Sequence, residues 1–394
     1  YSSGTHTITF NSTIWDALSV AQQQTIFDAA QLKWWTTNAV AVVYYIRGTS
    51  TNVNGTETFS VVFIDDDTQA IHTENITCSV DGNGYFEYQY QGKRIYSAER
   101  MVSTTPSHQV ESIEFTEEMS ELTNALAMFA NNTLITSVAF PNATFDKLTT
   151  AWSTFSGCSN LASIDLGRAL FPVLTNAKAM FQNCNALTSL DLSEALFDEL
   201  LEASNMFQCK VPTIKLTNAT FKKVTNMGSM FRENNMLTTL DLSNATFESV
   251  TDASWCFYNV LVGNLSMPKA TFASVTNIYA MFINAKAATL DLPKTTFASV
   301  TGASAAFSGM SNLQNIVLTE TNIAFGNITT NVTLQNSPLT YQSILNVANW
   351  LADRSGLTAY TITFKTSAWN ALSTAEKNNI DTILSGKNWT RAIA

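Results

Sequence analysis

A phenylalanine that recurs about every 25 residues constrains the fold of this chain more than any other feature. Its successive copies are separated by 26, 26, 24, 26, 25 and 25 residues, and a second phenylalanine series runs with nearly the same period. The first series comprises Phe145, Phe171, Phe197, Phe221, Phe247, Phe272 and Phe297. The second comprises Phe129, Phe155, Phe181, Phe207, Phe231, Phe257, Phe282 and Phe307. Two series that share one period predict an array of stacked repeats.

Each repeat begins with a short stretch of alternating polar and apolar residues. In the clearest copy, Leu240 and Leu242 flank Asp241, which predicts a strand with one buried and one exposed face. The same alternation recurs in the other repeats at Ile164/Leu166, Leu190/Leu192, Ile214/Leu216, Leu265/Met267, Leu290/Leu292 and Ile316/Leu318.

After the strand and a turn, apolar residues recur at helical spacing. Their positions i, i+3, i+6 and i+7 predict a short amphipathic helix. In one repeat they are Val224, Met227, Met230 and Phe231. A single strand and helix cannot bury both apolar faces, but stacked copies can. We therefore expect an α/β solenoid of about eight units over residues 117–320, with a parallel sheet along one wall.

The amino-acid sequence of the repeats resembles that of a known family. The segment 237–247 reads Leu-Thr-Thr-Leu-Asp-Leu-Ser-Asn-Ala-Thr-Phe, and Val-Thr and Met-Phe pairs follow in most units. This phrase resembles the BspA-like branch of leucine-rich-repeat proteins. The resemblance implies a right-handed leucine-rich coil and a role in recognition without chemistry. Family members are mostly cell-surface or secreted proteins of host-associated bacteria, and similar repeats are found in phage structural proteins.

The two ends of the chain carry copies of one module. Residues 7–35 match residues 361–389 without gaps at an offset of 354, and each copy predicts a strand, a turn and a helix. Ser373 with Glu376, and Ser19 with Gln22, fit capping boxes at helix starts. Thr340 is expected to cap a further helix. We expect residues 1–37 and 321–394 to be strand–helix caps that shield the open ends of the array.

A different segment separates the N-terminal module from the repeats. Residues 38–116 contain five stretches rich in β-branched and aromatic residues, punctuated by Asn-Gly, Asp-Gly and Gln-Gly turns. These stretches predict a small antiparallel β-domain, with residues 104–107 as a linker to the solenoid. Asp65, Asp66 and Asp67 are expected at a hairpin tip, because they lack the spacing and the glycine of a calcium loop.

Composition and motif content argue against several classes of function. Only 13% of residues are charged and the formal net charge is −10, which argues against binding to nucleic acid. The longest apolar run, residues 40–46, is too short to span a bilayer. His6, His72 and His108 are scattered, and neither a zinc motif nor a catalytic or phosphate-binding motif is present. We therefore expect no cofactor, no metal site and no enzyme activity, although distant residues could still assemble a catalytic site.

Three cysteines recur with the period of the repeats. Cys158, Cys184 and Cys209 are separated by 26 and 25 residues. They could form a ladder of disulfides or metal ligands. The alternative, which we favour, is a column of small buried side chains, because a buried free cysteine behaves as a small apolar residue.

The exposed strand positions form the sharpest candidate for ligand contact. Acids occupy this position in four units, a lysine occupies it in another, and Thr239 is close by. The candidate residues are Asp165, Asp191, Lys215, Asp241, Asp291 and Thr239. They could contact a cation or a polar partner on the sheet face. Alternatively, they form a solvated column that keeps an exposed sheet soluble.

Three functions remain open from the sequence. The first is an extracellular or cell-surface binding and adhesion scaffold of a host-associated bacterium, with a protein or glycan partner. The second is a structural or receptor-binding chain of a phage virion, with other virion chains as partners. The third is an enzyme. The chain begins at Tyr1 without an initiator methionine, so we expect it to be a mature or excised piece.

Overall fold

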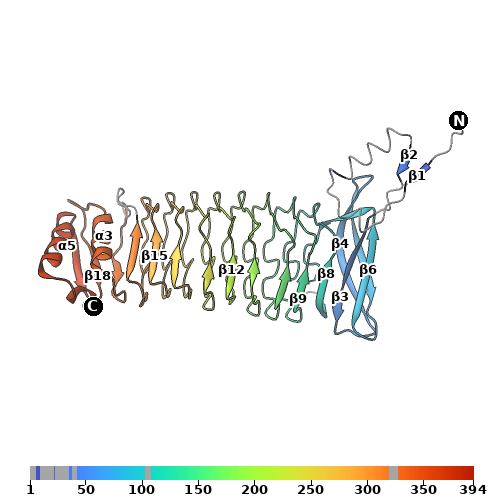
Figure 1. Ribbon diagram of the computed structural model, residues 1–394, viewed down its shortest axis with the longest axis horizontal. Coiled ribbons are helices and arrows are strands. Elements are labelled where there is room, and N and C mark those ends of the chain that lie inside the picture. Colours follow the sequence, from blue (N-terminus) through green and yellow to red (C-terminus); the bar gives the residue numbers. More distant parts are fainter. Residues whose placement is uncertain (1–5, 9–21, 23–34, 38–41, 103–107, 319–326) are drawn as a thin grey trace.

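The protein is a parallel β-solenoid of about ten turns. In the computed structural model an antiparallel β-sandwich lies at the N-terminal end of the rod and a cap with three helices lies at its C-terminal end (Figure 1). The described residues are 6–8, 22, 35–37, 42–102, 108–318 and 327–394. The expected linker at residues 104–107 lies outside them.

The first wall of the solenoid is built from one short strand per coil. The strands pair in parallel and in register in three successive groups, so that in one of them Leu190, Ile214 and Leu240 lie side by side on the inner face. Their bounds are β8 (Val110–Phe115), β9 (Ser137–Ala139), β10 (Ser163–Asp165), β11 (Leu190–Asp191), β12 (Thr213–Lys215), β13 (Thr239–Leu240), β14 (Asn264–Ser266), β15 (Thr289–Leu292) and β16 (Asn315–Leu318). The predicted parallel sheet wall is therefore confirmed.

The second wall consists of turns linked by parallel bridges, and the predicted repeat helix is absent from it. The bridges join Asn124, Thr150, Asn176, Glu202, Asn226, Asp252, Asn277 and Gly302 in one line. Ser229, within the segment expected to be helical, has φ 59°, and Glu233, two residues after that segment, has φ 61°. Left-handed residues at these positions end an α-helix. The apolar spacing that suggested a helix therefore reflects the corners of the coil, and the α/β expectation fails for the repeats.

The core of the solenoid contains two columns of stacked phenylalanine rings. The first series forms one file, with ring centroids 5.2–5.7 Å apart and planes within 22° of one another. In the second series the centroids are 5.1–6.0 Å apart. The expectation that Phe171, Phe197, Phe221 and Phe247 align is therefore confirmed.

The first phenylalanine column lies at a strained corner of the backbone. From Phe145 to Phe297 every member has a positive φ, between 44° and 56°. Left-handed backbone costs a residue other than glycine about 1–2 kcal/mol. Burial of a phenylalanine side chain contributes about 1.5–3 kcal/mol, which is enough to offset this cost in each coil.

Threonine hydroxyls tie neighbouring coils together at the surface. Thr149 donates to the carbonyl of Thr123 at 3.0 Å, and Thr175 donates to that of Thr149 at 3.0 Å. The same contact recurs at Thr251 and Thr276. A neutral side chain that bonds to the preceding coil can therefore occupy an exposed position, which is consistent with the low charge of the chain.

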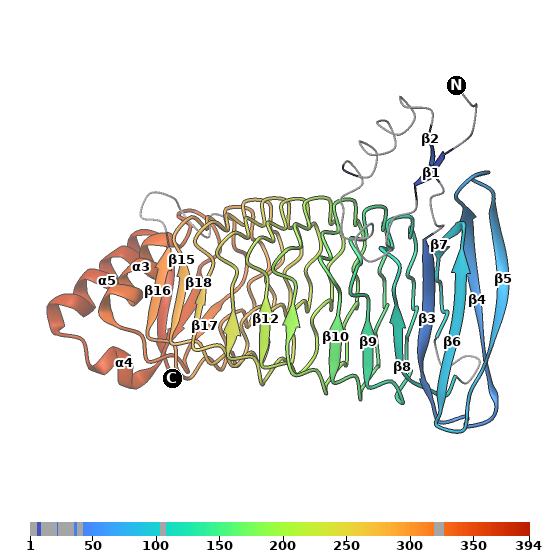
Figure 2. The ribbon, with the colours of Figure 1, turned by 45° about the vertical axis from the view of Figure 1, so that its right-hand side comes forward.

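The N-terminal β-sandwich continues both walls of the solenoid. Its strands are β3 (Val43–Ser50), β4 (Thr56–Asp65), β5 (Ile71–Ser79), β6 (Tyr85–Gln91) and β7 (Lys93–Ser97). Strand β3 pairs antiparallel with β6 and β8, and β8 pairs parallel with β9. In the second sheet, β4 pairs with β5 and β7, and Ser97 at the end of β7 bridges Asn124 of the first coil. The sandwich thus covers one end of the coil array (Figure 2).

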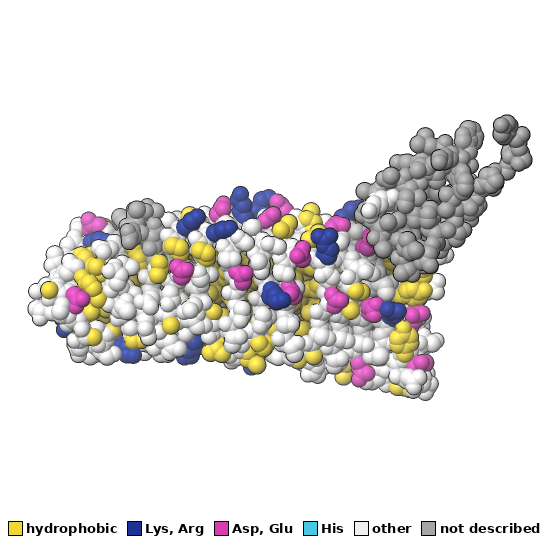
Figure 3. Space-filling view, in the orientation of Figure 1, with side chains coloured by type: hydrophobic (Ala, Val, Ile, Leu, Met, Phe, Trp, Pro, Cys, Tyr) yellow, Lys and Arg dark blue, Asp and Glu magenta, His cyan; other side chains and the backbone are white. Residues whose placement is uncertain are grey.

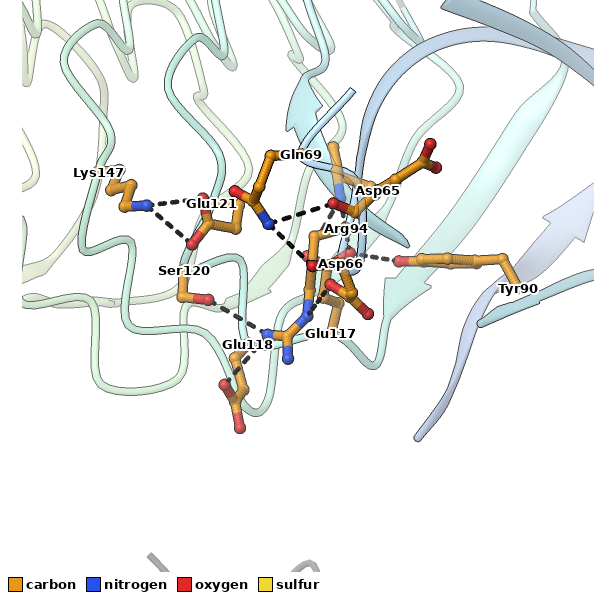
Figure 4. A network of polar contacts seen from close by, with 11 residues as sticks. Asp65, Asp66, Gln69, Tyr90, Arg94, Glu117, Glu118, Ser120, Glu121 and Lys147 are labelled. Atoms are coloured by element: carbon orange, nitrogen blue, oxygen red, sulfur yellow. Dashed lines mark hydrogen bonds and ion pairs between the residues drawn. The ribbon is translucent and has the colours of Figure 1, made fainter. Parts of the chain in front are cut away.

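A buried carboxylate lies where the sandwich meets the first coil. Glu117, two residues after the end of β8, is fully buried and accepts a 2.6 Å hydrogen bond from the Tyr90 hydroxyl of β6. Both its oxygens also accept from the backbone N–H of Ile95 in β7 at 3.1 Å. Arg94 lies nearby, with Asp66 3.5 Å and Glu118 3.6 Å from its nitrogens (Figure 4). Glu117 therefore connects both sheets to the solenoid.

The C-terminal cap contains helices at the positions that its capping residues predict. Thr340 caps α3 (Tyr341–Trp350), and Ser373 with Glu376 forms a complete capping box on α5 (Thr374–Gly386). A short helix, α4 (Thr366–Asn370), precedes α5. Both capping predictions for this end are confirmed.

The two terminal modules share one strand pairing. At the C-terminus β18 (Tyr360–Phe364) lies between β17 (Val332–Leu334) and β19 (Trp389–Ile393), with Tyr360 opposite Trp389. At the N-terminus β1 (His6–Ile8) pairs with β2 (Trp35–Thr37), with His6 opposite Trp35. Both pairings are parallel and have the same register. The paired residues of the two modules correspond at the sequence offset of 354. Apart from Gln22, the rest of the N-terminal copy, including Ser19, lies outside the described residues.

Candidate functional site

The sheet face brings the predicted contact residues into one file along the first wall. Asp191 of β11 lies opposite Lys215 of β12, and Asp291 of β15 lies opposite Ser266 of β14. Asp165 ends β10, Asp241 follows β13, and Thr239 lies opposite Thr213. The file is exposed to partly exposed along its length, so it can be reached from solvent.

One ion pair crosses this file. The Lys215 ammonium lies 2.7 Å from Asp191 Oδ2, and both side chains are more than half exposed. The hydrogen bond from Lys215 lowers the pKa of Asp191. An exposed pair of this kind contributes only about 0–1 kcal/mol to stability. Its charges therefore remain available to a partner at small cost to the fold.

Three of the four acids of the file also close the turns that follow their strands. The Oδ1 atoms of Asp165 and Asp191 accept backbone N–H groups two residues ahead, at 2.9 and 3.1 Å. Asp241 accepts the N–H of Ser243 at 3.0 Å, and this bond is the main cause of its lowered pKa. Asp291 instead accepts the Ser266 hydroxyl at 2.7 Å. Local turn chemistry thus explains the acid at three of these four positions.

A hollow of about 330 Å³ opens where two adjacent strands end. Its lining includes Asp165, Arg168, Asp191, Ser193 and Glu194. The described residues contain no group of three or more His, Cys, Asp or Glu side chains that could hold a metal ion. Because Arg168 lines the hollow together with carboxylates, the hollow offers both signs of charge to a polar ligand at the edge of the sheet face.

The second wall carries an aromatic group that sequence reasoning missed. The Arg232 guanidinium carbon lies 5.1 Å from the ring centre of Trp255 and 5.4 Å from that of Tyr258. The Trp255 ring lies 5.4 Å from Tyr279 of the next coil. Alignment of the coils on the second phenylalanine series could have revealed this group, since the position of Trp255 otherwise holds alanine, serine or asparagine.

The predicted cysteine column is a set of small buried side chains, and disulfides are absent. All five cysteines, Cys78, Cys158, Cys184, Cys209 and Cys256, are free and buried. Cys158 and Cys184 donate through Sγ to the carbonyls of Phe129 and Phe155, both at 3.0 Å. These contacts place each thiol against the preceding coil.

We expect the thiols of the folded protein to resist modification. Burial raises the pKa of Cys158 and of Cys209 to about 12, so the reactive thiolate is scarce at neutral pH. Titration with 5,5′-dithiobis(2-nitrobenzoate) at pH 8 should detect no fast-reacting thiol in native protein. It should detect all five after unfolding in guanidinium chloride. Rapid stoichiometric reaction of a native thiol would contradict this placement.

Similarity to known proteins covers part of the coil array. Residues 201–320 match a family model described as DUF285, Mycoplasma protein of unknown function. The match spans less than a third of the chain. No curated protein and no solved structure matches the chain. No helix within the described ranges is long and apolar enough to cross a membrane.

Proposed function

We propose that this chain is a non-catalytic binding scaffold of the BspA-like leucine-rich-repeat type, acting outside the cell or on its surface. Its partner would be a protein or a glycan of a host or bacterial surface. The sequence phrase of the repeats supports this type, and the match of residues 201–320 to a family described from Mycoplasma is consistent with a bacterial source.

One observation carries the proposal: the coils repeat their interior but vary their exterior. The inward strand position is apolar in every unit. The outward position next to it changes from Asp191 to Lys215 and Asp241, and later to Ser266 and Val317. A sheet that varies only on its exposed face keeps its backbone constant while its contact chemistry differs along the rod. Extended surfaces of this kind are the ones that repeat proteins use for binding.

The rigidity of the array supports the same role. Stacked rings fill its interior, and hydrogen bonds join neighbouring coils along both walls. The sandwich covers one end and the helical cap lies at the other (Figure 1). A surface that is already ordered loses little conformational entropy when it binds. Charged side chains on one long face lie scattered among hydrophobic and other uncharged side chains (Figure 3), so this face can make both polar and apolar contacts.

The role of the sheet face can be tested by removing its acids. Fluorescently labelled protein is incubated with cultured epithelial cells and with bacterial cells, and retention is measured by flow cytometry. We expect saturable retention. Simultaneous change of Asp165, Asp191, Asp241 and Asp291 to Asn should weaken it by about tenfold, because each exposed charge contributes roughly 0.2–1 kcal/mol.

A matched control removes four acids from other surfaces. Asp67, Asp146 and Asp198 are changed to Asn and Glu248 to Gln, all of them exposed and outside the file. This variant should be retained like the unmodified protein. Undiminished retention of the sheet-face variant would remove the acids from the binding surface. If neither cell type retains the protein and the protein self-associates in solution, the alternative role as a virion component would be favoured.

A further inference from the structure

The Arg232 corner of the second wall combines an aromatic surface with a polar hollow. We call Arg232, Trp255, Tyr258 and Tyr279 the aromatic platform. The hollow, here called the notch, has a volume of about 280 Å³. It is lined by Asn183, Asn185, Gln208, Cys209, Lys210 and Glu233.

The notch results from a local deletion in the repeat. Only four residues, 208–211, lie between Phe207 and the next coil's Pro212. In the flanking coils six residues occupy the same corner, 182–187 before it and 232–237 after it. The shortened corner therefore leaves a gap between two full-length ones, and polar side chains of three successive coils surround it.

The platform and the notch adjoin one another. Glu233 lines the notch and directly follows Arg232 of the platform. Asn259, which follows Tyr258, donates from Nδ2 to Glu233 Oε2 at 3.2 Å and holds this carboxylate at the boundary. The Nε of Arg232 is buried and has no hydrogen-bond partner among the described residues.

The coil itself does not require the aromatic side chains of the platform. The position of Trp255 is held by Ala179, Ala280 and Ala305 in other coils, with φ of 54–57° against 59° for Trp255. The position of Tyr279, whose side chain is 43% exposed, is held by serine in three other coils. Tyr279 is exposed and Trp255 is partly exposed, both at positions where small residues suffice, and such rings point to contact with a ligand.

We propose that the platform and the notch bind a glycan, as a specific case of the scaffold function proposed above. A pyranose ring has an apolar C–H face that stacks on the exposed Tyr279 ring, which the Trp255 ring meets edge-on at an interplanar angle of 70°. The hydroxyls of the adjoining sugar bind in the notch. Hydroxyls donate and accept, and the notch supplies amides that do both, a carboxylate that accepts and an ammonium that donates. An apolar protein anchor would instead leave these polar groups without partners.

The structure offers substitutions that the coil already tolerates. Trp255→Ala, Tyr279→Ser and Glu233→Asn each introduce a residue found at the same position of another coil. Glu233 has φ 61°, and Asn183 and Asn259 adopt the same left-handed backbone. The control is Trp152→Ser, at the coil position of Tyr279 and equally exposed at 43%. Lys178 lies over the Trp152 ring, but neither residue lines the notch.

The experiment uses an array of immobilised neutral, N-acetylated and sialylated oligosaccharides, followed by calorimetric titration of the strongest binder. We expect Trp255→Ala and Tyr279→Ser each to weaken binding by at least about tenfold, since the first removes the ring packed edge-on against Tyr279 and the second removes the stacking ring itself. Glu233→Asn should weaken it similarly through lost hydroxyl contacts. Trp152→Ser should bind within about twofold of the unmodified protein.

The possible outcomes separate this inference from the general scaffold function. Absence of binding to every glycan on the array would overturn the inference, and so would an equal loss in the Trp152→Ser control. If cells retain the platform variants to the same extent as the unmodified protein, the inferred glycan site is rejected while the proposed scaffold function stands. Binding of a purified protein that depends on Trp255, with no glycan bound, would replace the glycan by a protein partner.

Discussion

Replacement of Phe231 by Ala should destabilise the solenoid by about 3–5 kcal/mol, the range measured for deletion of large buried side chains. The Phe231 ring is fully buried, and its centroid lies 5.4 Å from those of Phe207 and Phe257. The deletion therefore removes two stacked aromatic contacts as well as apolar area. Coils contact only their neighbours, so the gap cannot be filled by rearrangement elsewhere. Urea unfolding followed by circular dichroism should show a lower midpoint.

Two further measurements make this prediction specific. Phe231→Leu keeps most of the apolar volume and should cost clearly less than the alanine variant. Hydrogen exchange should accelerate mainly in the coils on either side of residue 231, because stability in such arrays is a sum of local and nearest-neighbour terms. An unchanged midpoint for Phe231→Ala, or an effect spread evenly over the rod, would contradict the stacked-column account.

The phenylalanine period predicted the stacking of the coils because the interior of a solenoid repeats with the chain. Any residue that fills the same place in successive coils must recur at the coil length, so a file of Phe171, Phe197 and Phe221 followed directly. The shared strand pairing of the two terminal modules could likewise be predicted from their sequence match. An ungapped match implies a shared backbone, and the two modules pair with equivalent register.

The absence of a repeat helix could not be predicted from apolar spacing, because a tight coil and a short helix bury residues at similar intervals. The distinguishing signal was present two residues after most rings of the second series. Asn131, Gly157, Asn183, Asn259 and Asn284 stand there, and all have positive φ. Asparagine and glycine are the residues that accept this backbone most readily. A recurring Asn or Gly at that position indicates a corner rather than a helix.

The candidate sites differ in how far the sequence reveals them. The file that contains Asp165, Asp191 and Asp291 follows from strand alternation alone. Its use in closing turns depends on backbone atoms two residues ahead, which alternation does not reveal. The aromatic platform joins Arg232, Trp255 and Tyr279 from three coils, and the notch arises from a deletion beside them. Both become visible only when the coils are aligned position by position.

Stability should also fall as the pH rises from about 4.5 to about 7, because Glu117 is buried at the junction of sandwich and solenoid. Burial raises the pKa of Glu117 from its ordinary value of 4.5 to about 7, against the opposing effects of Tyr90, Ile95 and Arg94. Between these values the folded protein keeps a proton that the unfolded chain releases. The stabilisation is therefore complete below about pH 4.5 and is lost as the pH rises through 7, by up to about 3 kcal/mol.

Comparison with Glu117→Gln isolates this effect from the other carboxylates. The amide stays neutral at every pH, so urea unfolding of the variant should lack the loss between pH 5 and pH 7 that the unmodified protein shows. Tyr90→Phe removes a hydroxyl that lowers the pKa of Glu117, so it should raise this pKa and extend the loss of stability above pH 7. Glu57 and Glu74, whose pKa values are lowered, act in the opposite direction and at lower pH. Parallel pH profiles for the unmodified protein and Glu117→Gln would show that the carboxylate is already charged in the folded state, held by Tyr90 and the backbone of Ile95.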